Sequence, residues 1–223
     1  IIRKALYNLK YTKKKSNSIS GKNFLITGAS SGIGLSLTKS LISKNKVIGV
    51  YNSNKLNLDN IRSNNLISVK CDFRNYSDFE NLNKVISEEK IDVIINCAGT
   101  FGSNNQSLEN IDFDNLISVF KINSTSIIKI LQLMEKNNST RSLSKIVNIS
   151  SDGGSIKLNN QGNAYIYRLT KSALNSISKN LSVDLYNKYK TEVVTIDPGN
   201  VTTGMNPKGF LDADKCSEYI LSL

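Results

Sequence analysis

The sequence predicts an α/β fold: one doubly wound domain with a mostly parallel sheet and helices on both faces. Short apolar segments alternate along the chain with segments of helical periodicity, as expected for a parallel sheet joined by right-handed crossovers. Most of the apolar segments are near-continuous runs of Val, Ile and Leu, which is typical of strands covered on both faces. The length of 223 residues suits a single large domain of this class.

The elements follow in order along the chain. We expect strands at residues 23–27, 46–51, 66–70, 93–96, 145–149 and 193–196. Helical patterns lie near residues 33–44, 77–89, 113–136 and 164–189, and in the last of them Leu174, Ile177, Leu181 and Leu185 recur at helical spacing. No internal repeat or low-complexity linker interrupts residues 21–223, so we assign them to one domain.

Residues 1–20 form a basic segment ahead of the first expected strand. The first acidic residue of the chain is Asp59, and much of the net charge of +11 is concentrated in this segment. We expect a flexible N-terminal extension, with a targeting segment as the alternative. No basic helix with interleaved aromatic residues follows, so nucleic-acid binding is not expected.

Composition excludes several classes of site. No stretch approaches the roughly 20 uninterrupted apolar residues of a membrane span, so we expect no membrane partner. Cys71, Cys97 and Cys216 lie far apart, which argues against a disulfide framework or a zinc site and fits a reducing, cytoplasmic setting. The absence of histidine leaves neither a His-based metal site nor a Ser-His-Asp triad, and we expect no metal.

A glycine-rich turn joins the first expected strand to its helix, in the sequence Thr-Gly-Ala-Ser-Ser-Gly-Ile-Gly at 27–34. In a dinucleotide-binding turn of the Rossmann type, Gly28 permits the tight turn and Gly32 lets the backbone approach the phosphates. Gly34 lets helix and strand pack closely, and the helix N-terminus offers its N–H groups to the anion. The alternative for this pattern alone is a β–α turn that binds nothing.

Small or polar residues also follow the next three strands. In a parallel sheet the ligand crevice lies at the carboxyl ends of the strands, where the order reverses. The residues expected there, besides the glycine turn, are Asn52, Ser53, Asp72 and the run Asn96-Cys97-Ala98-Gly99. The alternative is that these strands simply end in polar loops that bind no ligand. This explains each residue taken singly, but it explains the presence of all of them less well.

Tyr167 and Lys171 lie four residues apart on one face of the last long helix, so a phenol and an ammonium can address the same crevice. A nearby cation stabilises a phenolate and lowers the pKa of the tyrosine, which suits acid–base chemistry near neutrality. Ser151 ends the fifth strand and is a hydroxyl suited to hold a carbonyl oxygen. Asn123 lies in an apolar helix, where a buried amide needs a hydrogen-bonded partner. It is either a satisfied core amide or part of a proton relay.

Taken together, these motifs resemble the short-chain dehydrogenase/reductases. The matching elements are Thr27-Gly28-x-x-x-Gly32-x-Gly34, Asn96-Cys97-Ala98-Gly99, Asn123, Ser151, Tyr167-x-x-x-Lys171 and Asp197-Pro198-Gly199-x-Val201-x-Thr203. Within that superfamily, residues 151–156 and 165–175 are similar to the C-factor and sniffer-type carbonyl reductases. Two departures are Cys97, where the family usually has Asn or another small residue, and the short segment after Met205.

The resemblance implies a role for each matching residue. Tyr167 would be the proton donor, and Lys171 would lower its pKa and hold the nicotinamide ribose. Ser151 would position the carbonyl and Asn123 would organise the relay, whereas the rival Tyr165 has Leu169 as its i+4 neighbour. Cofactor contacts are expected from Gly28, Ser30, Ser31, Gly32, Ile33, Gly34, Asn52, Asp72, Asn96, Ala98, Gly99, Lys171, Pro198, Gly199, Val201 and Thr203.

The end of the second strand bears on the choice of cofactor. No acidic residue precedes Asp59 there, so no carboxylate would repel the 2′-phosphate of NADP. Ser30, Ser31, Asn52, Ser53 and Lys55 can satisfy that phosphate, although the arginine common near this position in NADP-preferring relatives is lacking. NADP(H) is therefore favoured over NAD(H).

The sequence thus predicts a cytoplasmic oxidoreductase that transfers hydride between NADP(H) and a small carbonyl or alcohol substrate. The resemblance implies a homodimer or homotetramer that pairs through the helices bearing Asn123 and Tyr167. The alternative is a cofactor-binding regulatory or sensor protein on the same scaffold, because fold alone does not imply function.

Overall fold

A seven-stranded parallel sheet forms the centre of the structure, a computed structural model that describes residues 2–4 and 19–222. Its strand order is β1-β7-β6-β5-β2-β3-β4, and every neighbouring pair is parallel. The strands are β1 Ile2–Lys4, β2 Asn23–Thr27, β3 Lys46–Tyr51, β4 Leu66–Lys70, β5 Val93–Asn96, β6 Lys145–Ile149 and β7 Glu192–Asp197. The predicted doubly wound α/β fold is confirmed.

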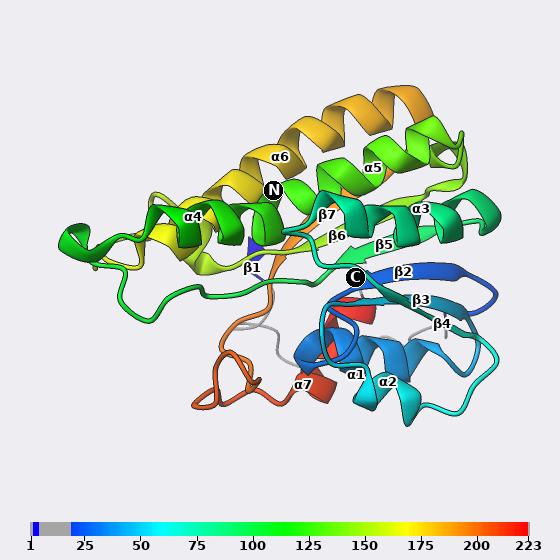
Figure 1. Ribbon diagram of the computed structural model, residues 1–223, viewed down its shortest axis with the longest axis horizontal. Helices are drawn as coiled ribbons and strands as arrows, with labels where there is room; N and C mark the ends of the chain where they lie inside the picture. The colour runs from blue at the N-terminus through cyan, green and yellow to red at the C-terminus, as the bar shows by residue number, and fades with distance from the viewer. Residues whose placement is uncertain (1, 5–18, 223) are drawn as a thin grey trace.

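Helices cover both faces of the sheet (Figure 1). They are α1 Gly32–Leu41, α2 Leu56–Asp59, α3 Phe79–Glu88, α4 Phe113–Phe120, α5 Ser126–Lys136, α6 Tyr165–Tyr189 and α7 Ala213–Leu221. The short helices α2 and α7 were not predicted, since neither is long enough to show a clear helical period.

Alternating side chains of each strand build two apolar cores. In β2, Leu25 packs with α3, α5 and α6 on one face, whereas Phe24 and Ile26 pack with α1 and α7 on the other. All three side chains are buried. Because both faces are covered, the strand needs apolar residues at consecutive positions, which is the pattern its sequence has.

The strand order reverses at β2. From β2 the chain continues to β3 and β4 on one side, and it then returns to β5, β6 and β7 on the other. The carboxyl ends of β2 and β5 consequently lie side by side, with Thr27 paired to Asn96. This switch point brings the glycine turn beside residues 96–99.

The N-terminal strand β1 differs from the flexible extension expected over residues 1–20. Ile2–Lys4 pairs in parallel with β7, in the register Ile2 to Thr195, and so adds an edge strand to the sheet. This pairing uses backbone N–H and C=O groups of β7 that would otherwise lie at an open edge. A strand of three residues is too short to show an alternation of side chains, so the sequence pattern did not predict β1. The rest of the expectation falls on residues outside the described ranges, apart from 19 and 20.

The helical run from Phe113 to Lys136 is apolar and long enough, by length and composition, to cross a membrane. Its buried side chains, including Ile127, Ile130 and Met134, instead belong to the core that packs against the sheet. A π-helical turn, Lys121–Thr125, separates α4 from α5 within this run. The apolar composition is therefore that of a core helix.

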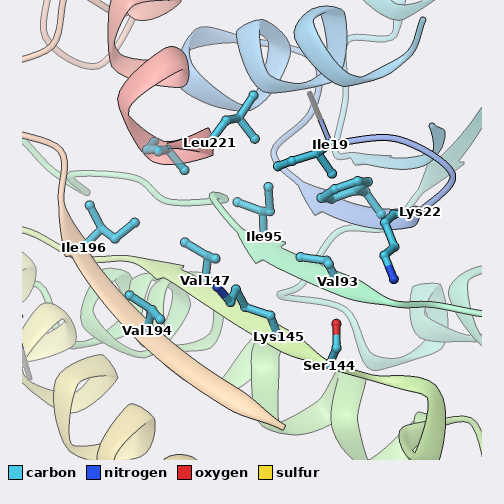
Figure 2. Close-up of a pocket in the computed structure, with 12 residues that line it drawn as sticks. Ile19, Lys22, Val93, Ile95, Ser144, Lys145, Val147, Val194, Ile196 and Leu221 are labelled. Atoms are coloured by element: carbon cyan, nitrogen blue, oxygen red, sulfur yellow. The ribbon is translucent and has the colours of Figure 1, made fainter. Parts of the chain in front are cut away.

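An apolar groove of about 190 Å³ lies on the sheet face that α1 and α7 share. Figure 2 shows Ile95, Val147, Val194 and Ile196 projecting from the strands beneath the end of α7 at Leu221. None of the predicted site residues lines this groove. The candidate site is elsewhere, at the carboxyl ends of the strands.

Candidate active site

The glycine turn after β2 is shaped by close backbone contacts. Gly28 has φ +68°, and a Cβ added there would lie 2.9 Å from Cα of Ala98. A Cβ on Gly34 would overlap the carbonyl oxygen of Gly28. Gly32 has φ +50°, and its added Cβ would lie 3.1 Å from Cγ2 of Thr203. Side chains are thus excluded from a cradle in which backbone N–H groups can face a phosphate, and this cradle fits a dinucleotide.

Thr27 connects the glycine turn to the end of β5. The sequence identified Thr27 only as part of the glycine motif and did not predict this connection. The Thr27 hydroxyl accepts hydrogen bonds from the N–H groups of Cys97 and Ala98, both at 3.0 Å. The same hydroxyl donates to Oδ1 of Asn96 at 3.0 Å. The Nδ2 atom of Asn96 is buried and has no hydrogen-bond partner within the described residues. An unmatched donor at this position is consistent with a ligand in the crevice.

The segment after β7 closes over the other side of the cradle. Gly199 has φ +77°, and its N–H donates to Oδ1 of Asp197 at 3.0 Å. Val201 is buried and forms an isolated bridge with Leu211. The chain then brings Thr203 against Gly32, so two segments about 170 residues apart in sequence meet where the pyrophosphate would lie. Pro198, between Asp197 and Gly199, also belongs to this segment.

The expected adenosine end lies at the ends of β3 and β4 and is more exposed. Asn52 and Ser53 are exposed, and Lys55 pairs with Asp59 at 3.0 Å. Asp72 is paired with Arg74 through a 2.6 Å contact, and hydrogen bonding from Arg74 holds the pKa of the Asp72 carboxyl below its usual range. The carboxylate of Asp72 is therefore already bound by a cation.

Ser30, Ser31 and Ile33 belong to the glycine turn, and Ile33 packs against the apolar core on the α1 side of the sheet. The carbonyl oxygen of Ser30 accepts a hydrogen bond from Nδ2 of Asn57 at 2.9 Å, which ties the turn to α2. Ser31 is the exposed residue directly before α1, with an extended backbone and no hydrogen bond from its side chain to the helix.

Tyr167 and Lys171 lie one turn apart near the start of α6, on the same side of the helix. The Lys171 ammonium is buried, lies 5.8 Å from the centre of the Tyr167 ring, and donates to the carbonyl oxygen of Ile149 at 2.9 Å. A Cβ added to Gly99 would lie 3.6 Å from this ammonium, so the end of β5 lies next to it. The rival Tyr165 is 43% exposed.

Ser151, the second residue after β6, adjoins the ring of Tyr167. Its hydroxyl accepts the N–H of Gly153 at 3.0 Å and lies against Asp152 at 3.1 Å. A Cβ added to Gly153 would lie 3.2 Å from Cε1 of Tyr167 and 3.3 Å from Oγ of Ser151. The two hydroxyl-bearing side chains are therefore neighbours across a glycine, as a shared carbonyl oxygen would require.

Asn123 lies in the π-helical turn between α4 and α5, and all its polar atoms are used. Its Oδ1 accepts from the N–H of Thr100 at 2.9 Å, while its Nδ2 donates to the carbonyl of Thr100 at 2.9 Å and to the hydroxyl of Thr170 at 3.0 Å. A π-helical turn is often found at a functional site. Here it aims a buried amide at the loop after β5, where it also lies close to Gly99.

Burial dominates the electrostatics of this cluster. Desolvation raises the pKa of Tyr167 above its ordinary value, against a lowering by the hydrogen bond with Ser151. Burial also lowers the pKa of Lys171 to about 8. The expectation that Lys171 lowers the pKa of Tyr167 is not met, because desolvation has the largest effect on the phenol, and the ammonium donates to the carbonyl oxygen of Ile149. At neutral pH the phenol therefore keeps its proton and can donate it.

Two residues next to Tyr167 were missed by sequence reasoning. The Phe101 ring lies 5.1 Å from the Tyr167 ring, centre to centre. Gln106 is buried; its Oε1 accepts the N–H of Tyr167 at 2.9 Å and its Nε2 donates to the carbonyl of Phe101 at 2.8 Å. Both belong to a polar loop with no periodicity, so no signal in the sequence indicated them.

Known proteins resemble this chain in sequence and in fold. The family model described as short chain dehydrogenase matches residues 22–213. The C-signal protein of Myxococcus xanthus is 31% identical over 115 residues, which cover 52% of this chain and 68% of that protein.

Two solved structures have a similar fold. The carbonyl reductase Sniffer of D. melanogaster superposes with a TM-score of 0.76 and 25% identity, over 88% of each chain. An NADPH-bound carbonyl reductase from chicken fatty liver superposes with a TM-score of 0.73 and 24% identity, over 91% of this chain and 89% of that one. The predicted resemblance, including its C-factor and sniffer-type relatives, is confirmed.

Proposed function

The chain belongs to the short-chain dehydrogenase family, and from that premise we propose that it is an NADP(H)-dependent reductase of ketones or aldehydes. The observation that carries the proposal is the meeting of Ser151, Tyr167 and Lys171 beside the glycine cradle. These residues come from the end of β6 and the start of α6, and the cradle follows β2. A proton donor and a site for a dinucleotide then share one crevice.

In this reaction, each residue of the site has a separate role. The cofactor, when bound, supplies the hydride. Ser151 orients the carbonyl oxygen of the substrate toward Tyr167, and Tyr167 donates its phenolic proton to that oxygen. The raised pKa of Tyr167 keeps the proton in place until the oxygen becomes basic. Lys171 holds the ribose hydroxyls, and Asn123 holds the loop after β5 through Thr100.

The preference for NADP(H) rests on the end of β3. Exposed Asn52 and Ser53 stand where a carboxylate would otherwise select NAD(H), and Lys55 supplies a cation nearby. Ser30 and Ser31 of the glycine turn add hydroxyls. The NADPH of the chicken carbonyl reductase is consistent with this choice.

Assembly into a homodimer or homotetramer is part of the proposal. Exposed apolar side chains occur on α4, α5 and α6, among them Phe113, Ile117, Ile128, Leu169 and Tyr186. Such side chains are stabilised when a second copy covers them. Sedimentation should give a multiple of the 24.6 kDa mass of the chain. A change of Leu169 to Glu should then reduce that mass.

The free thiols of Cys71, Cys97 and Cys216 fit a reducing compartment, so we place the reaction in the cytoplasm. Burial raises the pKa of the Cys97 and Cys216 thiols to about 12, so both stay neutral beside the site.

The test is NADPH oxidation with a panel of reactive ketones, quinones and aldehydes. Tyr167→Phe removes the donated proton and should reduce turnover by about 10²-fold or more, while NADPH binding is retained. Tyr165→Phe is the matched control, because it also removes a phenolic hydroxyl. Tyr165 is exposed and lies two residues before Tyr167, so this variant should keep activity.

Equal activity in Tyr167→Phe and the wild type would refute the assigned role of Tyr167. Tight NADPH binding with no turnover of any carbonyl would favour the alternative, a cofactor-binding regulatory protein.

A further inference from the structure

A polar pocket of about 370 Å³ lies beside the catalytic cluster, in contrast to the apolar groove of Figure 2. One wall is the loop after β5 and the other is the segment that leads into α6. The residues that form it include Phe101, Asn104, Gln106, Gln161, Asn163 and Arg168. Amide side chains are hydrogen-bond donors as well as acceptors, so the lining suits a polar ligand.

Arg168 is the one charged residue among those that line this pocket. Its Nε atom is buried and has no hydrogen-bond partner in the described part of the chain. Arginine presents its donors in a planar fork that matches a carboxylate or a phosphate. A buried donor without a partner is unfavourable unless a ligand completes it. The charge and the unmatched donor both point to an anion.

The backbone at the pocket wall is held in an uncommon conformation. Gly162, Asn163 and Ala164 are three consecutive residues with positive φ, at +63°, +55° and +50°. Glycine and asparagine tolerate this region, but alanine adopts it rarely. Backbone strain of this kind clusters at ligand sites, where the surrounding structure enforces it. Asn163 and Ala164 both line the pocket, and the carbonyl oxygen of Ala164 accepts the N–H of Arg168 at 2.9 Å.

Two contacts and one neighbour in the sequence join the pocket to Tyr167. Phe101 lines the pocket and packs its ring on that of Tyr167. Gln106 lines it and accepts the N–H of Tyr167. Arg168 follows Tyr167 directly in α6. The pocket therefore adjoins Tyr167 through residues that line the one and contact the other.

We propose that the pocket binds an anionic group, a carboxylate or a phosphate, carried by the carbonyl substrate, and that Arg168 pairs with it. This inference rests on the proposed reductase function and names its substrate class: an oxo acid or oxo phosphate whose anion is separated from the carbonyl by a spacer. The excess of 29 Lys and Arg over 18 Asp and Glu also raises the local concentration of such anions.

The test compares charged substrates with their neutral counterparts. Methyl-ketone acids of increasing chain length, their methyl esters and the corresponding phosphonates are assayed with NADPH. The wild type should prefer at least one anion to its ester, and the carboxylate and phosphonate arms tell the two anions apart. In Arg168→Gln this preference should fall by about 10- to 100-fold, with kcat/KM for the ester unchanged.

Two further variants serve as controls. Arg141→Gln removes a cation from an exposed position away from the pocket and should leave the preference intact. Arg168→Lys keeps the charge without the planar fork and should retain part of the preference, and it also serves if Arg168→Gln fails to fold.

The outcomes separate this inference from the proposed function. Esters that are reduced as well as the acids, or an equal loss for both in Arg168→Gln, would overturn the anion pocket while Tyr167-dependent turnover stands. If no substrate is turned over, binding of the acids to the protein with NADP is measured by calorimetric titration. Binding of an acid that Arg168→Gln abolishes supports the pocket even if the reductase function fails, and no binding overturns it.

Discussion

At the glycine turn the close contacts are between backbone atoms, whereas around Tyr167 they are hydrogen bonds and ring contacts between side chains. An added Cβ at Gly28 would lie 2.9 Å from the backbone of Ala98, so no side chain fits at that position of the turn. Asn123, by contrast, makes three hydrogen bonds of 2.9 to 3.0 Å to two other segments. Steric exclusion therefore shapes the proposed cofactor end, whereas burial and polar pairing shape the proposed catalytic end. The two should fail in different ways.

The largest expected effect is at the cofactor end. Gly34→Val places a side chain against the carbonyl oxygen of Gly28, a backbone atom that cannot move without opening the turn. We expect a loss of at least about 3 kcal/mol in the free energy of unfolding, measured by denaturant titration, together with loss of NADPH binding. Gly204→Ala is the control, because nothing lies within 4 Å of its added Cβ. Equal stability of the two variants would contradict the steric account.

Lys171→Met, at the proposed catalytic end, should reduce activity without reducing stability. Loss of the ammonium should reduce kcat/KM by about 10²-fold, with stability at pH 7 kept or increased, since the fold no longer buries a charge. Folding lowers the pKa of Lys171 from 10.5 to about 8. The unfolded chain therefore binds more protons between these values, and stability should rise with pH there.

That rise should be absent in Lys171→Met, as measured by unfolding titrations from pH 7.5 to 10.5. An unchanged slope would show that another group causes it. In the wild type, kcat/KM should fall above about pH 8, as the ammonium loses its proton.

Asn123→Ala should have an intermediate effect. It leaves the N–H and C=O of Thr100 and the hydroxyl of Thr170 without this partner. We expect a loss of about 2 kcal/mol in stability and a reduced kcat at unchanged KM for NADPH, because the glycine cradle is not touched. Ser124→Ala, one residue along, removes a single hydrogen bond to the carbonyl of Thr170 and should keep kcat. A kcat that falls equally in both variants would assign the effect to the π-helical turn as a whole.

The smallest expected effect is at the adenosine end. Lys55 and Asp59 form an exposed pair, and solvent screening leaves such a pair little effect on stability. Lys55→Ala should leave stability nearly unchanged and raise KM for NADPH a few-fold, with KM for NADH unchanged, because only NADP(H) carries the 2′-phosphate. Equal changes in KM for both cofactors would remove Lys55 from the phosphate site.

Much of the fold was predictable because its signals are local. The six predicted strands are present, and the last, β7, extends one residue beyond the prediction at each end. Consecutive buried positions, such as Phe24, Leu25 and Ile26, leave a run of apolar residues that can be read directly. The edge strand β1, the short helices α2 and α7, and the π-helical turn left no such run.

The site divides in the same manner. The glycine turn and the pair Tyr167 and Lys171 are compact motifs, so their positions were predicted, and the structure brings them together with Ser151. Phe101 and Gln106 lie next to Tyr167 only because the loop after β5 folds back onto α6. Their contacts join positions about 60 residues apart, and no spacing in the chain records them.

The sequence by itself determined the positions of six strands, the glycine turn and the pair Tyr167 and Lys171. Each of these depends on backbone sterics or on the side-chain period of a single element. Only the tertiary structure decided the direction in which the pKa values of Tyr167 and Lys171 shift. Burial raises the pKa of Tyr167 and lowers that of Lys171, the reverse of what a phenol beside an ammonium suggests in isolation. Desolvation depends on everything packed around a group, and that is known only once distant segments have met.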